Sequence, residues 1–127
     1  MDSNIHEGES HRLVRALLET PALARWLYPR ADPSGLEPNA TQVLLVISLE
    51  DEVSTGRIAE RLTLSQGTVR YALNKLEARG LIAEGANGPD ARRRQHRLTL
   101  EGRRVVDNFV ARSRASLEEW AEKTDQY

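Results

Sequence analysis

The sequence contains no cysteine among its 127 residues. Disulfide bonds, thiolate metal sites, cysteine nucleophiles and cysteine-based redox sensing are therefore excluded. Long hydrophobic runs are missing too, since the longest, Val43–Ile47, is far too short to span a bilayer. The first ten residues are polar and acidic and lack the apolar core of a signal peptide. We therefore expect a cytoplasmic protein that does not contact the membrane.

Patterns typical of catalysis and metal binding are also missing. His6 and His11 are five residues apart, so a helix would not place them on one face as a metal-binding pair requires, and His96 lies far along the chain. The sequence has no phosphate loop, no Gly-x-Ser-x-Gly elbow and no paired acidic motif. We expect no metal, no cofactor and no enzymatic activity.

The charges that are present are unevenly distributed along the chain. Residues 57–104 hold eleven Lys or Arg and five Asp or Glu, a net charge of +6, whereas the flanking residues together carry −7. The total of −1 therefore conceals a basic centre between acidic ends. Such a centre indicates a surface that binds a polyanion, although solvated helix faces rich in arginine would give the same count.

The length fits one domain, and the pattern of apolar residues is mainly helical. A first helix over residues 6–19 is followed, at Thr20 and Pro21, by the start of a second that runs to Leu27. Three prolines and a glycine predict a loop over residues 29–38. Asn39 and Gln42 resemble a capping box that would open an apolar helix over residues 40–49.

Two short helices joined by a tight turn follow, which predicts a helix-turn-helix. Ser54 can cap a supporting helix that includes residues 57–62, and Ser65 can cap a recognition helix that ends before Gly80. The face of this second helix opposite its apolar residues is polar and suits a major groove, where Arg pairs with guanine and Asn or Gln with adenine. The candidate DNA-contacting residues here are Ser54, Ser65, Gln66, Gly67, Thr68, Arg70, Tyr71, Asn74 and Lys75.

A basic hairpin comes next and predicts the wing of a winged helix. Residues 81–84 and 95–98 are short enough to be two strands, and the loop between them carries Arg92, Arg93 and Arg94. An arginine at such a position can enter the minor groove while its neighbours contact phosphates. Asp90 would hold the tip of the wing in shape by pairing with Arg92. The fold class that we expect is thus mainly α with a small β-hairpin.

Residues 40–104 resemble the winged helix-turn-helix of MarR-type transcriptional regulators. The similar segments are Ile58-Ala59-Glu60-Arg61-Leu62, Leu64-Ser65-x-x-Thr68-Val69, Leu76-Glu77-x-x-Gly80-Leu81-Ile82, Asp90-x-Arg92 and Leu98-Thr99-x-x-Gly102. The resemblance implies a homodimer on double-stranded DNA, two recognition helices in successive major grooves of a pseudo-palindromic operator, and Arg92 in the minor groove. It also implies a small aromatic effector.

The two ends of the chain carry the apolar residues that a dimer would use. A long final helix that Thr99 can cap has an apolar stripe that extends to Trp120, and the first helices have a second apolar stripe. Both stripes would suit a dimer interface, although packing within one chain would also explain them. We expect one domain over 1–127, with dimerisation helices at 5–28 and 100–124 and the winged helix-turn-helix at 39–99. The candidate dimerisation residues are Leu13, Leu17, Trp26, Phe109, Leu117 and Trp120.

The function expected from the sequence is that of a dimeric, sequence-specific transcriptional regulator that represses by occupying an operator, and so is associated with the nucleoid. Two alternatives stay open. One is a winged helix that contacts protein, which would show no salt-dependent affinity for DNA. The other is a component of replication or partition machinery that binds DNA with little sequence preference.

Overall fold

The computed structural model describes residues 2–31, 36–85 and 94–125, and the chain divides into two compact units. Unit 1 is formed by Met1–Gly35 and Asp107–Tyr127, and unit 2 by Leu36–Val106. None of the helices in the described residues has both the length and the apolar character needed to cross a membrane. Each unit has its own helices, and only unit 2 has strands among the described residues.

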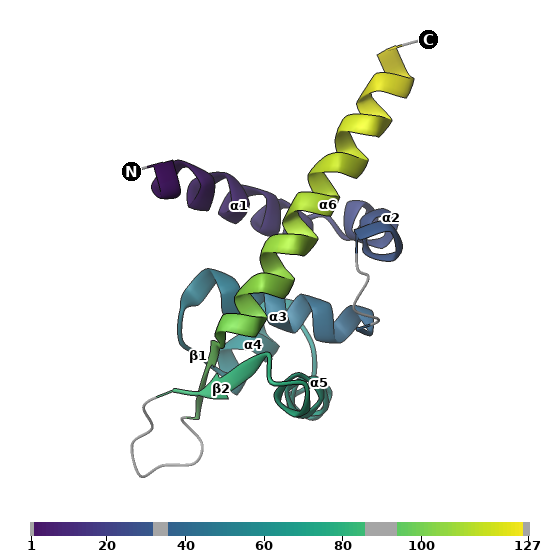
Figure 1. Cartoon of the computed structure of the whole chain (residues 1–127). Helices are drawn as coiled ribbons and strands as arrows, with labels where there is room; N and C mark the ends of the chain where they lie inside the picture. The colour runs from purple at the N-terminus through teal and green to yellow at the C-terminus, as the bar shows by residue number, and fades with distance from the viewer. Residues whose placement is uncertain (1, 32–35, 86–93, 126–127) are drawn as a thin grey trace. The chain divides into compact units, whose positions relative to one another are not determined.

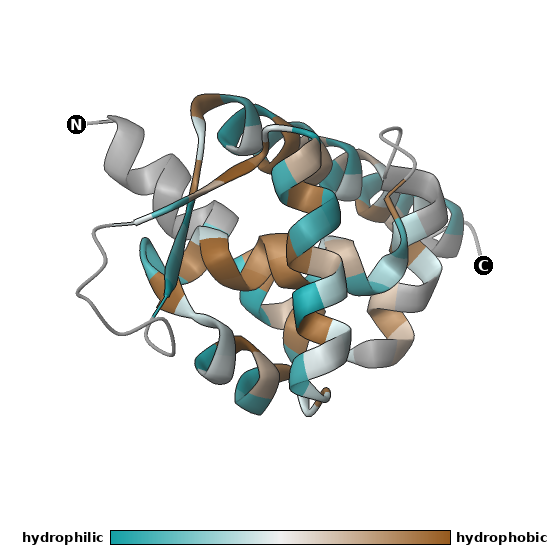
Figure 2. Ribbon diagram, turned by 90° about the horizontal axis from the view of Figure 1, so that it is seen from below, coloured by the Kyte–Doolittle hydropathy of each residue, from teal (hydrophilic) through white to brown (hydrophobic). Residues whose placement is uncertain are grey.

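Unit 2 is built around a buried helix, α3 (Pro38–Glu50), which packs against α4 (Thr55–Leu62) and α5 (Gln66–Ala78) (Figure 1). Eight of the nine residues from Ala40 to Ser48 are buried, all except Gln42, and Figure 2 shows α3 as a largely hydrophobic helix. The prediction of an apolar helix here is confirmed. Because α3 is covered on most sides, it fixes the positions of the two helices that follow it.

A three-stranded antiparallel sheet completes unit 2, in the order β1 (Val53–Ser54), β3 (Gln95–Leu98) and β2 (Ile82–Glu84). The predicted hairpin is confirmed as β2 and β3, with Ile82 opposite Leu98. The central strand also pairs with β1, where Val53 lies opposite His96. The short strand β1 therefore ties the hairpin to the residue that precedes α4.

The helix ends in unit 2 follow local sequence signals. Ser54 accepts a hydrogen bond from the Arg57 amide at 3.2 Å, and Ser65 accepts one from the Thr68 amide at 3.1 Å, so both predicted caps are confirmed. After α5, Gly80 has φ 71°, a left-handed conformation that glycine adopts without strain. Thr99 caps the last helix by accepting a hydrogen bond from the Gly102 amide at 3.0 Å.

Two predictions about residues 29–42 are wrong. The capping box of Asn39 and Gln42 does not form, because α3 begins two residues earlier than predicted, at Pro38, whose fixed φ and missing amide hydrogen suit the first helical position. The loop predicted over residues 29–38 is too long, because α2 (Pro21–Ala31) continues past Pro29. A proline in the last turn removes only one backbone hydrogen bond, which the preceding turns tolerate.

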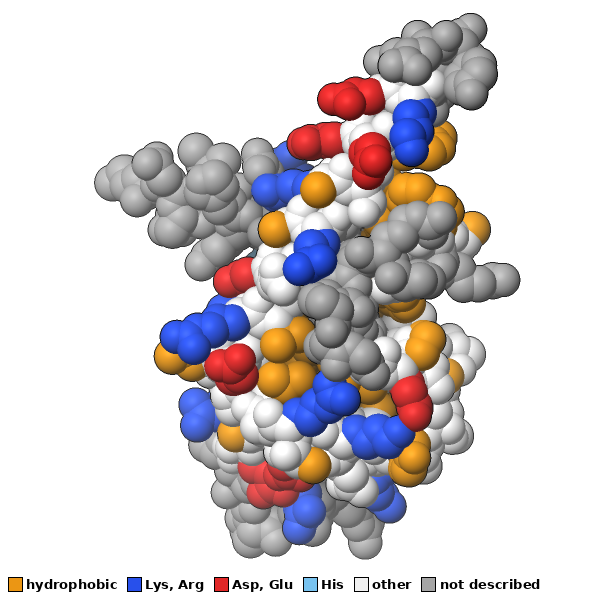
Figure 3. All heavy atoms as spheres, turned by 45° about the vertical axis from the view of Figure 1, so that its right-hand side comes forward, with side chains coloured by type: hydrophobic (Ala, Val, Ile, Leu, Met, Phe, Trp, Pro, Cys, Tyr) orange, Lys and Arg blue, Asp and Glu red, His pale blue; other side chains and the backbone are white. Residues whose placement is uncertain are grey.

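Unit 1 contains α1 (Asp2–Glu19), α2 and the greater part of α6 (Leu100–Asp125). The predicted break at Pro21 is confirmed, although α1 begins four residues before the expected start. Helices α1 and α2 pack together, and the rings of Tyr28 and Phe109 lie 5.7 Å apart, which connects α2 to α6. Toward the end of α6, acidic side chains gather on the surface (Figure 3), at Glu118, Glu119 and Glu122.

Candidate nucleic-acid interface

The helix-turn-helix of unit 2 is formed by α4, a three-residue turn and α5. Thr63 ends α4 in the left-handed conformation, with φ 55°, and the Leu64 amide donates a hydrogen bond to the Ala59 carbonyl at 3.0 Å. The Ser65 and Thr68 hydroxyls are also hydrogen-bonded, at 2.8 Å. These local contacts fix the direction in which α5 leaves the turn, and so they fix the orientation of its exposed side relative to α4.

One face of α5 is buried, which determines what its other faces present to solvent. Val69, Ala72, Leu73 and Leu76 are at most 4% exposed. At about 100° per residue, Gly67, Tyr71 and Asn74 lie opposite this buried face, and all three are exposed. Gln66, Arg70 and Glu77 lie on one flank, while Thr68 and Lys75 lie on the other.

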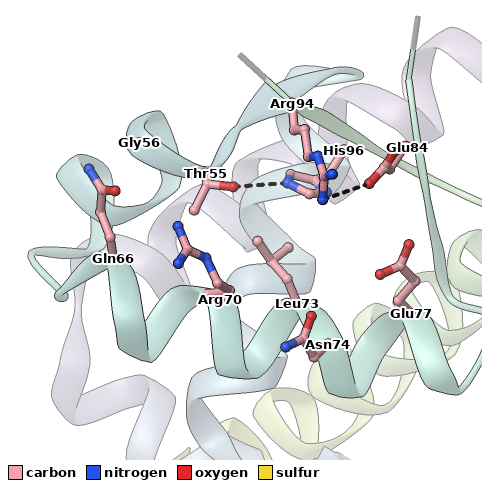
Figure 4. Close-up of a pocket in the computed structure, with 10 residues that line it drawn as sticks. All are labelled: Thr55, Gly56, Gln66, Arg70, Leu73, Asn74, Glu77, Glu84, Arg94 and His96. Carbon is pink, nitrogen blue, oxygen red and sulfur yellow. Dashed lines mark hydrogen bonds and ion pairs between the residues drawn. The ribbon is translucent and has the colours of Figure 1, made fainter. Parts of the chain in front are cut away.

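The first flank borders a groove of about 580 Å³ between α5, the start of α4 and the sheet. Figure 4 shows the α5 side chains along one wall, with Thr55 and His96 on the opposite wall. Arg94, which the sequence assigns to the wing, lies at the start of β3 and pairs with Glu84 on β2 at 3.5 Å. The groove is lined by Thr55, Gly56, Gln66, Arg70, Leu73, Asn74, Glu77, Glu84, Arg94 and His96.

His96 connects the hairpin to the helix-turn-helix. The residue is 8% exposed, and its Nε2 lies 3.0 Å from the hydroxyl of Thr55, the first residue of α4. Burial lowers the pKa of His96 below its ordinary value of 6.5, more than the nearby Glu77 and Glu84 carboxylates raise it. His96 is therefore neutral at pH 7 and holds β3 against the beginning of α4.

The second flank of α5 carries a contact between distant parts of the chain. The Lys75 ammonium donates a hydrogen bond to Glu37 Oε1 at 2.5 Å and lies 4.6 Å from the centre of the Tyr71 ring. The hydrogen bonds to Glu37 and then to Tyr71 raise the pKa of Lys75 above its ordinary value of 10.5. Lys75 is thus a cation whose charge is already paired.

The structure brings together most of the residues that the sequence assigns to DNA. Those of α5 and Arg94 are in unit 2, on or beside the exposed side of α5. Ser54 differs, since its hydroxyl accepts the capping hydrogen bond of α4. Asp90, Arg92 and Arg93 lie outside the described residues.

Several residues of this surface were not among the sequence candidates. Thr55, Glu77, Glu84 and His96 line the groove, and Glu37 pairs with Lys75. No pattern in the sequence indicates the contact between Thr55 and His96, which are 41 residues apart. The pairing of Lys75 with Glu37, 38 residues away, is likewise not indicated by any pattern in the sequence.

The candidate dimerisation residues are found in unit 1, with different degrees of exposure. Leu17 and Phe109 are buried within the chain, at 0% and 4% exposure, whereas Leu13, Trp26 and Leu117 are half-buried. Trp120 is 56% exposed and borders a groove of about 490 Å³ with Trp26. Among the described residues of unit 1, Trp120 is therefore the large apolar side chain most exposed to solvent.

Comparison with protein families gives one match, to the model described as MarR family, over residues 34–93. This range contains α3, α4, α5, β1 and β2 and extends into the segment after β2. None of the curated proteins compared is similar enough to the chain in sequence to count as a match.

Many solved structures have the same fold. ZitR of Lactococcus lactis, a zinc-responsive MarR family member, is 26% identical, with a TM-score of 0.59 over 76% of this chain and 67% of ZitR. YusO of Bacillus subtilis is also 26% identical, with a TM-score of 0.65 over 79% of this chain and 74% of YusO. The MarR family transcription regulator SP03579 is 21% identical, with a TM-score of 0.70 over 91% of this chain and 80% of the other.

Proposed function

We propose that the chain, a DNA-binding transcriptional regulator of the MarR type, acts as a homodimeric repressor that occupies a pseudo-palindromic operator. The observation that carries this proposal is α5, whose buried face is anchored in unit 2 while its polar face is exposed. A helix held in this way can enter a major groove without changing its own packing. A small aromatic effector, implied by the resemblance to MarR-type regulators, is part of the same proposal.

Base reading would come from the exposed side of α5. Arg70 suits guanine, whose O6 and N7 accept a bidentate pair of hydrogen bonds, and Asn74 suits adenine through N6 and N7. Gln66 and Thr68 lie in the first turn of α5, next to the Ser65 cap, where amides and the helix dipole favour a phosphate. Gly67 has no side chain, so the backbone can approach the DNA closely at this point.

The hairpin would add contacts beside the major groove. Arg94 is exposed at the start of β3, on the groove that α5 borders, and is suited to a phosphate. The sequence assigns Arg92 to the minor groove and Arg93 to the phosphates of the DNA, and it assigns Asp90 to holding the tip of the wing in shape. In this arrangement α5 specifies bases, whereas the wing adds affinity that depends little on sequence.

Dimerisation would place two copies of α5 one helical turn of DNA apart, about 34–36 Å. We assign the interface to the apolar surface of unit 1 that one chain leaves accessible, at Leu13, Trp26, Leu117 and Trp120. Leu17 and Phe109 would then support this surface from within the core of the chain. The two-fold axis of the dimer would match that of the operator.

Selection of binding sites from a random duplex library, followed by titration of point variants, tests this proposal. Arg70→Ala and Asn74→Ala are each expected to lose about 1–3 kcal/mol of binding free energy on the selected site. The loss should be much smaller on a site in which the base pair contacted by that side chain has been changed. Arg112→Ala, which removes an exposed arginine from α6 in unit 1, is the matched control and should leave base preference unchanged. Equal losses on all sequences for Arg70→Ala and Asn74→Ala would contradict base reading by α5.

A further inference from the structure

The flank of α5 that faces away from the groove carries the cation Lys75, which is already paired with the carboxylate of Glu37. Lys75 Nζ lies 2.5 Å from Glu37 Oε1, although the two side chains are 37% and 59% exposed. The ammonium also lies over the exposed ring of Tyr71. Lys75 is therefore held in place at the edge of the face that the proposed function assigns to DNA.

Glu37 is positioned by the backbone at the start of α3. It is the N-cap residue of that helix, yet its side chain makes no capping hydrogen bond within the described part of the chain. Glutamate is not among the preferred N-cap residues, since Ser, Thr, Asp and Asn accept the amide of the first turn better. The carboxylate extends to α5 instead, and the packing of α3 on α5 fixes the distance that it has to cover.

The pair contributes little to folding but changes the surface electrostatics. Exposed ion pairs add little to the free energy of unfolding because water screens them and because ordering two long side chains costs entropy. Lysines beside a recognition helix raise affinity for every DNA sequence, since each phosphate contact releases condensed counterions. A carboxylate on such a lysine removes that contribution for as long as the pair persists.

We propose that Glu37 is a specificity-determining residue, because its carboxylate competes with DNA phosphates for Lys75 and so withholds one sequence-independent contact. The inference rests on the proposed function, since it needs the exposed side of α5 to approach DNA. Affinity for random DNA is lowered by this competition, whereas base contacts from Arg70 and Asn74 are left intact. The ratio of operator affinity to random affinity is raised as a result.

The test is a salt titration of Glu37→Gln on a random duplex, followed by fluorescence anisotropy. The amide keeps the size of the side chain but cannot compete as an anion, so affinity is expected to rise by up to about fivefold at low salt. The slope of log K against log salt should steepen by about 0.9. Raising salt from about 50 to 200 mM should then cost the variant about 3.5-fold more affinity than it costs the wild type.

Three controls separate competition from a general change in charge. Glu118→Gln removes the same charge from an exposed position of α6 and should leave the slope unchanged. Lys75→Gln alone should leave the slope close to that of the wild type, because its phosphate contact is already withheld, and adding Glu37→Gln to it should have no further effect. A wild-type slope in Glu37→Gln, a lower affinity in that variant, or the same steepening in the Lys75→Gln background would overturn the proposal.

The proposed function can fail separately from this inference. If the wild-type protein binds its selected site, and Glu37→Gln does not change affinity for the random duplex, only the role of Glu37 is overturned. A wild-type protein that binds no DNA would overturn both.

Discussion

At the scale of single residues, His96 shows how one imidazole can hold a strand against the start of a helix. It is buried, opposite Val53 in the sheet, and hydrogen-bonded to Thr55 at the start of α4. A neutral ring can share this hydrogen bond as donor or acceptor, whereas a charged ring would lose hydration on burial. The position of the hairpin therefore depends on His96 staying neutral.

This dependence predicts an acid-sensitive stability. Because the folded pKa of His96 is below 6.5, the unfolded chain binds more protons than the folded one as the pH falls through 6.5. The free energy of unfolding should decrease over this range and stop decreasing below the folded pKa. Urea denaturation at pH 7.5 and 5.5 should show a larger loss for the wild type than for His96→Gln, whose amide can still bond to Thr55. Equal losses in the two proteins would contradict this role.

At the scale of elements, the first turn of α6 packs closely on Leu81, the residue that precedes β2. A Cβ built on Gly102, in the first turn of α6, would collide with the backbone carbonyl of Leu81. The same carbonyl accepts a hydrogen bond from the Thr99 amide at 3.0 Å, and the Thr99 hydroxyl donates one to the Gly80 carbonyl at 2.6 Å. The start of α6 is therefore packed directly on the turn that follows α5.

Gly102→Ala is expected to lower the free energy of unfolding by about 1–3 kcal/mol, because backbone has to move to admit one methyl group. Gly67→Ala is the matched control, since a Cβ there would meet only Ser65 Oγ, at 4.0 Å, among the described atoms. That change should be neutral or stabilise α5 by up to about 1 kcal/mol. Chemical denaturation of both variants measures this difference. An unchanged free energy of unfolding in Gly102→Ala would refute the close packing.

Elements were predictable from sequence wherever the signal was local. Ser54, Ser65 and Thr99 cap helices through residues only three positions away, so their roles could be read from spacing alone. The start of α3 was misassigned because two helix-start signals, Pro38 and the Asn39–Gln42 pair, overlap there.

The candidate site was predictable only in part, for the same reason. Helical periodicity identified the exposed residues of α5, since their faces follow from the sequence of one helix. The partners of that helix could not be identified. Glu37 meets Lys75, and Thr55 meets His96, only after α3, α5 and the sheet have packed, and no pattern within a single element records either contact.

At the scale of the whole molecule, charge and apolar surface are assigned to different units. The basic residues between Arg57 and Arg104 belong to unit 2, which carries the candidate DNA interface. Unit 1 carries the acidic end of α6 and the exposed Trp120. A large exposed aromatic beside half-buried apolar residues is typical of an interaction surface rather than of a monomer in isolation.

Replacing Trp120 is expected to weaken the proposed dimer. Trp120→Ser removes the most exposed aromatic side chain among the described residues of unit 1 and should shift the protein from dimer to monomer in sedimentation velocity at micromolar concentration, because interface aromatics carry much of the binding energy. Trp120→Phe keeps an apolar ring and should remain dimeric. A Trp120→Ser protein that stays dimeric would exclude this end of α6 from the interface, and a monomeric wild type would refute the dimer itself.

Sequence-specific DNA binding by the chain is tested most directly by a fluorescence-anisotropy titration at two salt concentrations. One duplex comes from upstream of the chain's own gene, and the other is a scrambled duplex of equal length. We expect salt-sensitive binding that is stronger on the upstream duplex by at least about a thousandfold. Equal affinity for the two duplexes, or no binding to either, would contradict sequence-specific binding.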